Sequence, residues 1–385
     1  MLQLSLWKKA GFRAISVAER GLRGSQSLAA DDLRKIRNFL VLQYESPLGS
    51  VVHATPLFEA LKRAAPDGYI AVAASPMAAA VLRHNPYIDR CLVTASPFAE
   101  FRQAVRSLRG MFQAMPTGPR CIVTTIGNQR SRIALLSLLA GGAIRAGYTL
   151  APELYHLPLS FQPERGQIEG NLDIVRRLGH TMEFREPHIF FGRQDAEHAR
   201  QWLELLPGGS GACRAAFVTH NSSGQSNRWS VERFRQVIAR LTQDRGVAPI
   251  FLGTAKDAAA IDALRQKLPD QGISLAGKTT ISELAAVLAQ CDLVVSQDTG
   301  TFHVARAVGL PGVVTAPAWQ SPLEWLPVNQ PRYRVLRGPT IEHPPADYSM
   351  EEISADQVYD AAVDLLEKFP ADPGRRAERV QDCLR

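Results

Sequence analysis

The chain has 385 residues, of which 45% are hydrophobic and 21% are charged, and its 44 basic and 37 acidic side chains give a net charge of +7. This composition is ordinary for a globular protein and excludes a wholly disordered, collagen-like or disulfide-scaffold chain. So small a basic excess suits an anionic ligand or an anionic membrane surface, and it does not indicate a nucleic-acid-binding protein. The length predicts two domains.

Residues 1–35 are expected to form an extension before the first strand. They mix Leu6, Trp7 and Phe12 with basic side chains, so one alternative is a short amphipathic helix on the inner face of an anionic membrane. The other alternative is a solvated extension. Lys8 and Lys9 interrupt the apolar stretch that a secretory signal would need.

The cysteine pattern and the hydropathy favour a cytoplasmic protein. The five cysteines are scattered along the chain, so we expect reduced thiols and neither a metal site nor a redox pair. No apolar run reaches the roughly 18 residues that a membrane span needs. No resident cofactor is expected.

Short apolar runs alternate with helical segments, which indicates parallel strands joined by crossover helices. In the first half, strands are expected at 36–44, 69–74, 91–94 and 121–126, and helices at 56–65, 77–84 and 131–141. In the second half, strands are expected at 215–220, 248–253, 273–277, 292–298 and 312–317, and helices at 230–244, 257–268, 281–291 and 300–308. The sequence therefore predicts an α/β fold with two doubly wound domains.

We expect an N-terminal domain over residues 36–185 and a C-terminal domain over residues 214–345. The segment 186–213 between them contains Pro187, Pro207 and a Gly-Gly-Ser-Gly run, a composition typical of a linker.

Residues 346–385 follow the second domain. A last helix is expected at 354–369, and a polar, loosely held tail after it. Because ligands of open α/β sheets bind beyond the carboxyl ends of the strands, the residues that follow each strand are the candidates for a site.

The turn after the first strand contains Glu45, Gly49, Ser50 and His53. A glycine here allows a ligand to approach the backbone, and Ser50 is placed either to cap a helix or to contact a substrate. Glu45 and His53 are the titratable candidates, although a lone histidine beside a helix is more often structural. The lysine of a phosphate-binding loop is absent.

The turn after strand 215–220 is rich in small hydroxyl residues. Ser222 and Ser223, together with backbone N–H groups, are suited to donate hydrogen bonds to phosphate oxygens, and Arg228 would add positive charge. The alternative is an ordinary serine-rich loop in which Ser230 caps the next helix.

The stretch from Asp298 to Ala305 is the most informative. Asp298 ends an apolar strand, and Thr299, Gly300 and Thr301 begin a helix. The free N–H groups and the positive dipole end of a helix form a site for a diphosphate, and His303 follows in the first turn. In the alternative, these polar side chains only cap the helix.

Another candidate pair follows strand 248–253. Asp257, a few residues after Gly253, would bind the ribose hydroxyls of a nucleotide. Capping of the following helix by Asp257 is an equally good interpretation.

Taken together, these stretches resemble glycosyltransferase family nine, the ADP-heptose:lipopolysaccharide heptosyltransferases, over about residues 36–338. The resemblance is carried, in this order, by Leu48–Pro56, His84–Arg90, Arg228–Phe234, Ala276–Thr279, Asp298–Ala305 and the segment Pro317–Pro327. Each motif is modest alone, but their order and spacing are specific.

The resemblance implies the GT-B architecture, in which two Rossmann-like domains face each other across a cleft and the C-terminal helix packs back on the first domain. It implies a metal-independent, inverting transfer of heptose from a nucleotide-diphosphate donor, usually ADP-heptose, to a lipopolysaccharide-core acceptor at the inner membrane face. By position, Ser222, Ser223, Thr299, Gly300 and His303 would hold the diphosphate, with Asp298 lining the donor site and Asp257 binding the nucleoside.

Two positions depart from the family pattern. Ser50 stands where the family typically has an aspartate that acts as general base, and serine has no useful basicity near neutral pH. Asn227 stands where the family typically has a lysine that offsets the charge of the leaving group. Glu45 or His53 is a candidate replacement for the base, and Arg228 for the cation.

These departures leave alternatives open. The chain is either an active transferase or a catalytically impaired relative that still binds a nucleotide sugar or a partner protein. Nucleotide-sugar epimerisation on the same fold is a third, weaker hypothesis, which predicts turnover without an acceptor.

Overall fold

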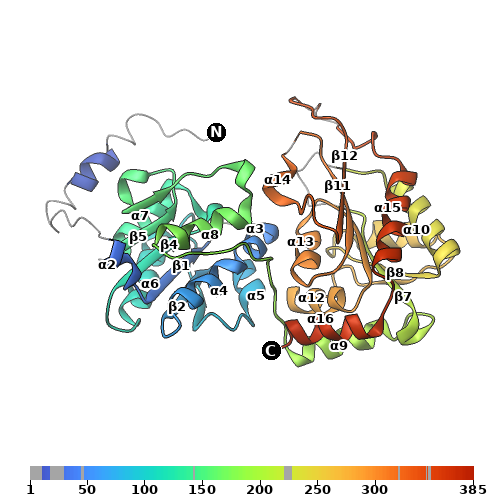
Figure 1. Ribbon diagram of the computed structural model, residues 1–385, viewed down its shortest axis with the longest axis horizontal. Helices are drawn as coiled ribbons and strands as arrows, with labels where there is room; N and C mark the ends of the chain where they lie inside the picture. The colour runs from blue at the N-terminus through green and yellow to red at the C-terminus, as the bar shows by residue number, and fades with distance from the viewer. Residues whose placement is uncertain are drawn as a thin grey trace. The chain divides into compact units, whose positions relative to one another are not determined.

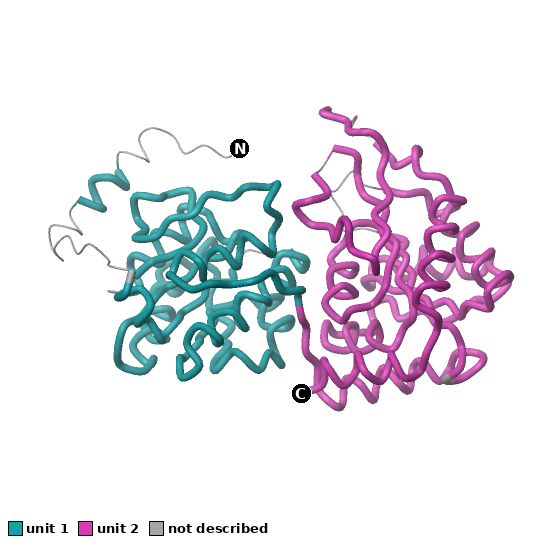
Figure 2. Tube along the Cα trace, in the orientation of Figure 1, with its two compact units in different colours: residues 1–187 teal, residues 188–385 magenta. Residues whose placement is uncertain are grey.

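A computed structural model describes the part of the chain that the following sentence gives by residue number. The described residues are 11–17, 30–44, 47–141, 144–220, 228–319, 321–343, 345 and 348–385. The chain divides into two compact units, Met1–Pro187 and His188–Arg385 (Figure 2). Each unit contains one six-stranded sheet (Figure 1), so the predicted α/β fold with two doubly wound domains is confirmed.

The sheet of unit 1 is parallel and has the strand order β3-β2-β1-β4-β5-β6. Its strands are β1 (Asn38–Gln43), β2 (Tyr69–Ala74), β3 (Arg90–Val93), β4 (Arg120–Thr124), β5 (Ile144–Tyr148) and β6 (Leu157–Leu159). The helices are α2 (Ala30–Arg34), α3 (Leu48–His53), α4 (Thr55–Ala64), α5 (Pro76–Leu82), α6 (Phe101–Gln113), α7 (Ser131–Ala140) and α8 (Gln167–Arg177).

Both faces of this sheet are covered, which is why β1 is buried along its whole length and reads as a continuous apolar run. On one face, α6 and α7 pack on β1, β2 and β4 through side chains such as Leu108 and Ile133. On the other face, α4 contacts β2 and α8 contacts β5. β5, β6, α6 and α8 were not predicted, because Arg145 and Pro158 interrupt the strands and polar residues dominate both helices.

The sheet of unit 2 is also parallel, with the strand order β12-β11-β10-β7-β8-β9. Its strands are β7 (Cys213–Val218), β8 (Val247–Phe251), β9 (Ile273–Ser274), β10 (Leu293–Gln297), β11 (Gly312–Ala316) and β12 (Tyr333–Arg337). The helices are α9 (Arg193–Leu203), α10 (Val231–Arg245), α11 (Ala258–Arg265), α12 (Ile281–Ala289), α13 (Gly300–Ala307), α14 (Pro322–Trp325), α15 (Ala355–Lys368) and α16 (Pro373–Cys383).

The core of unit 2 lies between the sheet and helices α10, α11 and α15, with Phe217, Phe234 and Leu365 buried in it. Helices α12 and α13 lie next to each other, and α13 packs on β10 and β11. The start of α12 is set by a capping box, because Thr280 Oγ1 accepts from the Glu283 N–H (3.2 Å) and the Glu283 carboxylate accepts from the Thr280 N–H (2.8 Å).

The predicted linker at 186–213 is wrong for most of its length. Residues Arg193–Leu203 form α9, which packs on α12, and His198 Nδ1 lies 2.8 Å from Glu283 Oε1. Apolar residues are few in this helix, and prolines and glycines flank it, so its composition resembles that of a linker. The boundary between the units lies at Pro187, two residues after the predicted end of the first domain.

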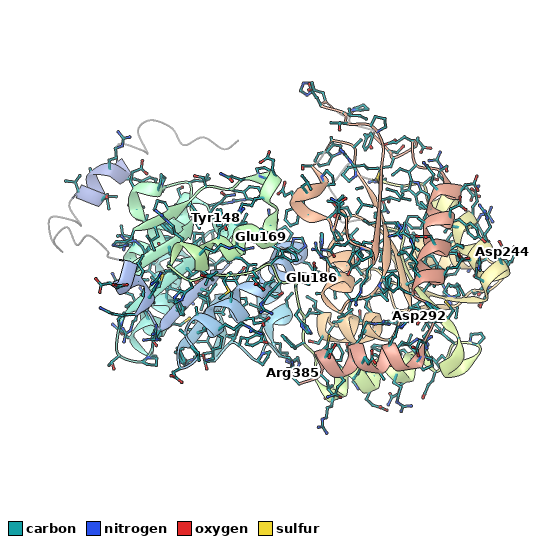
Figure 3. All side chains as sticks on the ribbon, in the orientation of Figure 1. Tyr148, Glu169, Glu186, Asp244, Asp292 and Arg385 are labelled. Atoms are coloured by element: carbon teal, nitrogen blue, oxygen red, sulfur yellow. The ribbon has the colours of Figure 1, made fainter. Side chains whose placement is uncertain are left out.

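The predicted loosely held tail is also wrong. Residues Pro373–Cys383 form α16, which packs on α12, and the side chain of Arg376 is buried. Asp292, labelled in Figure 3, accepts two hydrogen bonds from the Arg376 guanidinium (2.8 and 2.6 Å) and one from the Arg214 N–H (2.8 Å). A buried ion pair therefore attaches the C-terminal helix to the amino ends of β7 and β10.

The last residues of the chain pair with the first residues of unit 2. The Phe191 N–H donates to the Cys383 carbonyl (3.1 Å), and the Arg385 N–H donates to the Phe191 carbonyl (3.0 Å). Helix α15 packs on α10 within the same unit. The packing of a C-terminal helix on the N-terminal domain stays a prediction.

Within the N-terminal extension, residues 11–17 are helical. Phe12 packs against the cluster that contains Leu154 and Tyr155, while Ile15 and Val17 are exposed. The expected binding of this extension to a membrane stays a prediction. Among the described residues, no helix combines the length and the apolar character that crossing a membrane requires.

We predict that Arg376→Met lowers the free energy of unfolding of unit 2 by about 3–5 kcal/mol, because it leaves the Asp292 carboxylate buried without its ionic partner. The matched control is Arg375→Met on the same helix, whose partner Asp372 is solvent-exposed (3.7 Å). That control is expected to change stability by no more than about 0.5 kcal/mol. Urea unfolding measures both, and equal losses would contradict the prediction.

Candidate functional site

Each sheet has a point at which the strand order changes direction. In unit 2, β7 lies between β8 and β10, so the crevice forms where the carboxyl ends of β7 and β10 lie side by side. In unit 1, β1 lies between β2 and β4, and the equivalent point is at the carboxyl ends of β1 and β4. The predicted site residues follow these strands. Four of them, Glu45, Ser222, Ser223 and Asn227, lie outside the described residues.

Helix α13 begins at the carboxyl end of β10, as predicted. Thr299 precedes the helix, and its carbonyl accepts the first hydrogen bond, from the Phe302 N–H (3.1 Å). The N–H groups of Gly300 and Thr301 come before that bond, where a helix has no internal acceptors. Both residues are partly exposed, so the start of α13 can donate hydrogen bonds to an anion.

Asp298 and His303 contact each other across this helix start. The distance between His303 Nε2 and Asp298 Oδ1 is 3.4 Å, and the two side chains are 5% and 11% exposed. The His303 ring also packs against Trp325, with ring centroids 5.9 Å apart. These two side chains therefore shape the turn, in line with the capping alternative, and the backbone N–H groups are left to bind an anion.

Gln297 connects the segments that surround the crevice. Its Oε1 accepts from the Trp229 N–H (2.7 Å), and its Nε2 donates to the Thr219 carbonyl (3.0 Å). The side chain is buried at the end of β10. One amide group thus holds both the end of the β7 segment and the residue after Arg228. Arg228 is exposed, and its carbonyl accepts from the Met350 N–H (2.9 Å).

The turn after β8 has a different explanation from the predicted one. Asp257 Oδ2 accepts from the Thr254 N–H (2.8 Å) and the Thr254 hydroxyl (2.7 Å), so this carboxylate oxygen shapes the turn between Gly253 and α11. The Gly277 N–H donates to the Gly253 carbonyl (3.0 Å), and its φ of +71° and the closeness of Ala255 leave no room for a side chain. This contact explains the glycine of the Ala276–Thr279 motif.

His220, which follows β7, has a lowered pKa. Burial disfavours its charged form and is the larger effect, while the negative charge of Asp257 opposes it. The Nδ1 atom of His220 lies 2.8 Å from the Thr219 hydroxyl. Since His220 and Asp257 interact electrostatically, the structure brings the ends of β7 and β8 together, although His220 was not predicted as a site residue.

Ser50 and His53 both lie on α3 in unit 1. Pro47 precedes this helix, so the interpretation of Ser50 as a helix cap is wrong. The Ser50 residue is 7% exposed, and His53 is only 1% exposed. The His53 carbonyl accepts from Asn171 Nδ2 of α8 (3.5 Å). Its burial favours the structural interpretation of this histidine.

Asn128 is the counterpart of Gln297 in unit 1. Its Oδ1 accepts from the Tyr44 N–H at the end of β1 (2.7 Å), and its Nδ2 donates to Gln43 Oε1 (3.3 Å). Sequence reasoning missed Asn128, Gln43 and Gln297. A glutamine that ends a continuous buried apolar strand is the signal that would have found two of them, because a buried amide needs specific partners.

This arrangement offers hydrogen-bond donors and positive charge to an anionic ligand at the carboxyl edge of unit 2. Among the described residues, no group of three His, Cys, Asp or Glu side chains is placed to hold a metal ion.

Comparison with known proteins identifies the family. The model of glycosyltransferase family 9 (heptosyltransferase) matches residues 134–346, which is more than half of the chain. The chain belongs to glycosyltransferase family 9. The match starts in α7 of unit 1 and covers the carboxyl edge of the unit 2 sheet with the Asp298 turn.

Known relatives and structures agree with this membership. Lipooligosaccharide heptosyltransferase 2 of Haemophilus influenzae is 32% identical over 108 residues, which are 26% of this chain and 31% of that relative. The glycosyltransferase family 9 structure from Veillonella parvula has a TM-score of 0.76 at 21% identity and covers 87% of this chain and 99% of its own. The E. coli ADP-heptose lps heptosyltransferase II has a TM-score of 0.68 at 19% identity, with 86% and 99% covered. These two structures confirm the GT-B type of fold.

We predict that Asp257→Asn lowers the pKa of His220 further, because it removes the negative charge that favours the imidazolium. Histidine NMR titration measures this change, and Asp262→Asn on the same helix α11 is the control. An unchanged or raised pKa of His220 would contradict the prediction.

The same lowered pKa has a consequence for stability. Above the ordinary value of 6.5, His220 is neutral in both folded and unfolded chains. As the pH falls through this value, the unfolded chain takes up the proton first, so this histidine reduces the stability of unit 2 at acid pH.

Proposed function

We propose that this chain is an inverting, metal-independent glycosyltransferase. It transfers a heptose or a related sugar from a nucleotide-diphosphate donor, ADP-heptose, to a lipopolysaccharide-core sugar or another cell-surface glycan. The family membership supports sugar transfer. The proposed donor and acceptor rest on the names of the relatives, a lipooligosaccharide heptosyltransferase and an ADP-heptose lps heptosyltransferase. The reaction is assigned to the cytoplasmic face of the inner membrane.

The observation that carries this proposal is the start of α13 beside the crevice of unit 2. The N–H groups of Gly300 and Thr301 would bind the diphosphate, with Thr299 and His303 completing the turn. Arg228, held near the end of β10 through Trp229 and Gln297, would add positive charge. Ser222 and Ser223 would contribute hydroxyl donors, and Gly253 and Asp257 would lie on the nucleoside side.

In the proposed reaction, an acceptor hydroxyl oxygen attacks the anomeric carbon on the face opposite the diphosphate. The bond between this carbon and the diphosphate oxygen breaks, and the nucleoside diphosphate leaves with the electron pair. Positive groups at the start of α13 stabilise this charge without a metal ion. The hydroxyl proton passes to a base. Because His53 is buried, Glu45 is the stronger candidate for that base.

The acceptor would bind at the carboxyl edge of the unit 1 sheet, near Ser50. Transfer requires that this edge faces the donor edge of unit 2, as the GT-B architecture implies.

We predict that ADP stabilises the wild-type protein, by about 2.7 kcal/mol at 100 times its dissociation constant. Gln297→Ala is expected to weaken ADP binding about tenfold, because both segments beside the crevice lose their hydrogen-bond partner. Titration calorimetry measures this affinity.

The control is Gln290→Ala, which removes a glutamine that donates to the Ala196 carbonyl (3.2 Å) near the opposite end of β10. It is expected to leave ADP affinity unchanged. If the wild type binds neither ADP nor an ADP-sugar, the proposed function is wrong.

A second candidate function is nucleotide-sugar binding without efficient transfer. Serine at position 50 and asparagine at position 227 favour it, and the burial of His53 removes one replacement for the base.

Single-turnover transfer from ADP-heptose separates the two candidates. In an impaired relative, the double change Ser50→Asp and Asn227→Lys is expected to raise the transfer rate about a hundredfold, which is the usual contribution of such groups. In an active enzyme, the wild type transfers the sugar efficiently and Glu45→Gln abolishes that activity. Wild-type transfer that resists Glu45→Gln would exclude Glu45 as the base.

A further inference from the structure

Unit 1 contains a cavity of about 390 Å³ at the carboxyl ends of β5 and β6. Its polar lining comes from Tyr148 at the end of β5, Ser160 and Gln162 after β6, Arg165, and Asp173 and Arg177 on α8. Figure 3 labels Tyr148 and the α8 residue Glu169 in this region. The volume lies within the range of small-molecule sites, roughly 300–1,000 Å³.

The acidic side chain in the cavity is already neutralised. Asp173 accepts hydrogen bonds from the guanidinium groups of Arg165 (2.7 Å) and Arg176 (2.7 Å), and Arg176 also donates to Glu169 (2.6 Å). Burial raises the pKa of Asp173, but these hydrogen bonds outweigh burial and lower it overall. Two arginines and two carboxylates therefore balance in charge.

Arg177 remains outside this balance. It lines the cavity, it is exposed, and it forms no hydrogen bond or ion pair with any described residue. The cavity thus presents one uncompensated positive charge, next to the hydroxyl of Ser160 and the amide of Gln162. This combination fits a ligand that has hydroxyl groups and one carboxylate or phosphate.

Close packing keeps this cavity in place. The Tyr148 hydroxyl donates to the Gly170 carbonyl (2.8 Å), and a side chain at Gly170 would meet Ile126 at 2.6 Å. The next residue, Asn171, accepts from the Ile126 N–H (3.3 Å) and donates to the His53 carbonyl. One stretch of α8 therefore contacts both the cavity and the segments after β1 and β4.

The cavity and the expected acceptor position share one edge of the sheet. β4 and β6 are separated by β5 alone. With neighbouring strands about 4.8 Å apart, the end of β6 lies roughly 10 Å from the end of β4. An oligosaccharide that reaches the crevice at β1 and β4 could extend along this edge into the cavity.

We propose that the cavity beside Arg177 binds an acidic sugar or a sugar phosphate of the acceptor, next to the unit that receives the transferred sugar. This inference rests on the proposed function and adds the chemical class of the acceptor. Arg177 binds the anionic group, while Ser160 and Gln162 bind hydroxyl groups.

The first test titrates the full-length protein with glucose 6-phosphate, glucuronate, glucose and inorganic phosphate, followed by NMR. At least one of the two acidic sugars is expected to bind about tenfold more tightly than glucose, because a charged hydrogen-bond partner adds this much. The tighter of the two identifies the phosphate or the carboxylate as the natural group. Equal binding of all three sugars would overturn the proposal. Inorganic phosphate that binds as tightly as the acidic sugars would also overturn it.

Substitutions locate the binding. Arg177→Gln is expected to remove the tenfold preference, and Arg177→Lys to retain part of it. The matched control is Arg106→Gln on α6, another exposed arginine without an ion pair among the described residues, which is expected to change nothing. A preference that survives Arg177→Gln would place the acidic-sugar site elsewhere and refute the assignment to this cavity.

The donor assay separates this inference from the proposed function. Arg177→Gln is expected to leave ADP affinity unchanged and, in transfer assays, to raise the KM for the acceptor about tenfold with little change in kcat. If the wild type binds ADP but prefers no acidic sugar, only the present inference fails. If the wild type binds no ADP, the proposed function fails first.

Discussion

A single buried amide, that of Gln297, joins the segments that form the candidate donor site. The end of β10 supplies this side chain, which holds the Thr219 carbonyl on one side and the Trp229 N–H on the other. Because an unpaired buried amide is costly, both partners are fixed relative to α13, whose first N–H groups follow three residues later. The positions of His220, of Arg228 and of the start of α13 depend on these two hydrogen bonds.

Unit 1 solves the same problem with Asn128. Both sheets change direction at their first strand, which leaves two neighbouring strand ends to be joined after a crossover. In unit 2 the polar side chain comes from β10 itself, and in unit 1 it comes from the turn after β4. The two edges differ in charge chemistry. Unit 2 offers the start of a helix to a diphosphate, whereas unit 1 offers the Arg177 cavity to an acidic sugar.

Much of the fold could be predicted from the sequence, since a strand covered on both faces is a continuous apolar run. β1, β7 and β10 were found in this way. β5 was missed because Arg145 lies in it, with its Nε donating to the Leu154 carbonyl (2.6 Å). The Asp298 turn was found from its place after a strand. The roles of Asp257 and His53 could not be found, because burial and hydrogen-bond partners come from tertiary contacts.

The pairing of Phe191 with Cys383 and Arg385 has a consequence for how such chains diversify. It brings the first and last strands of chain in unit 2 to one point, so this half is a closed module with a single attachment. A closed module can be exchanged as a whole, since both of its ends already meet. Recombination at Pro187 would then combine one acceptor half with a new donor half, and the sugar that is transferred would change independently of the glycan that receives it.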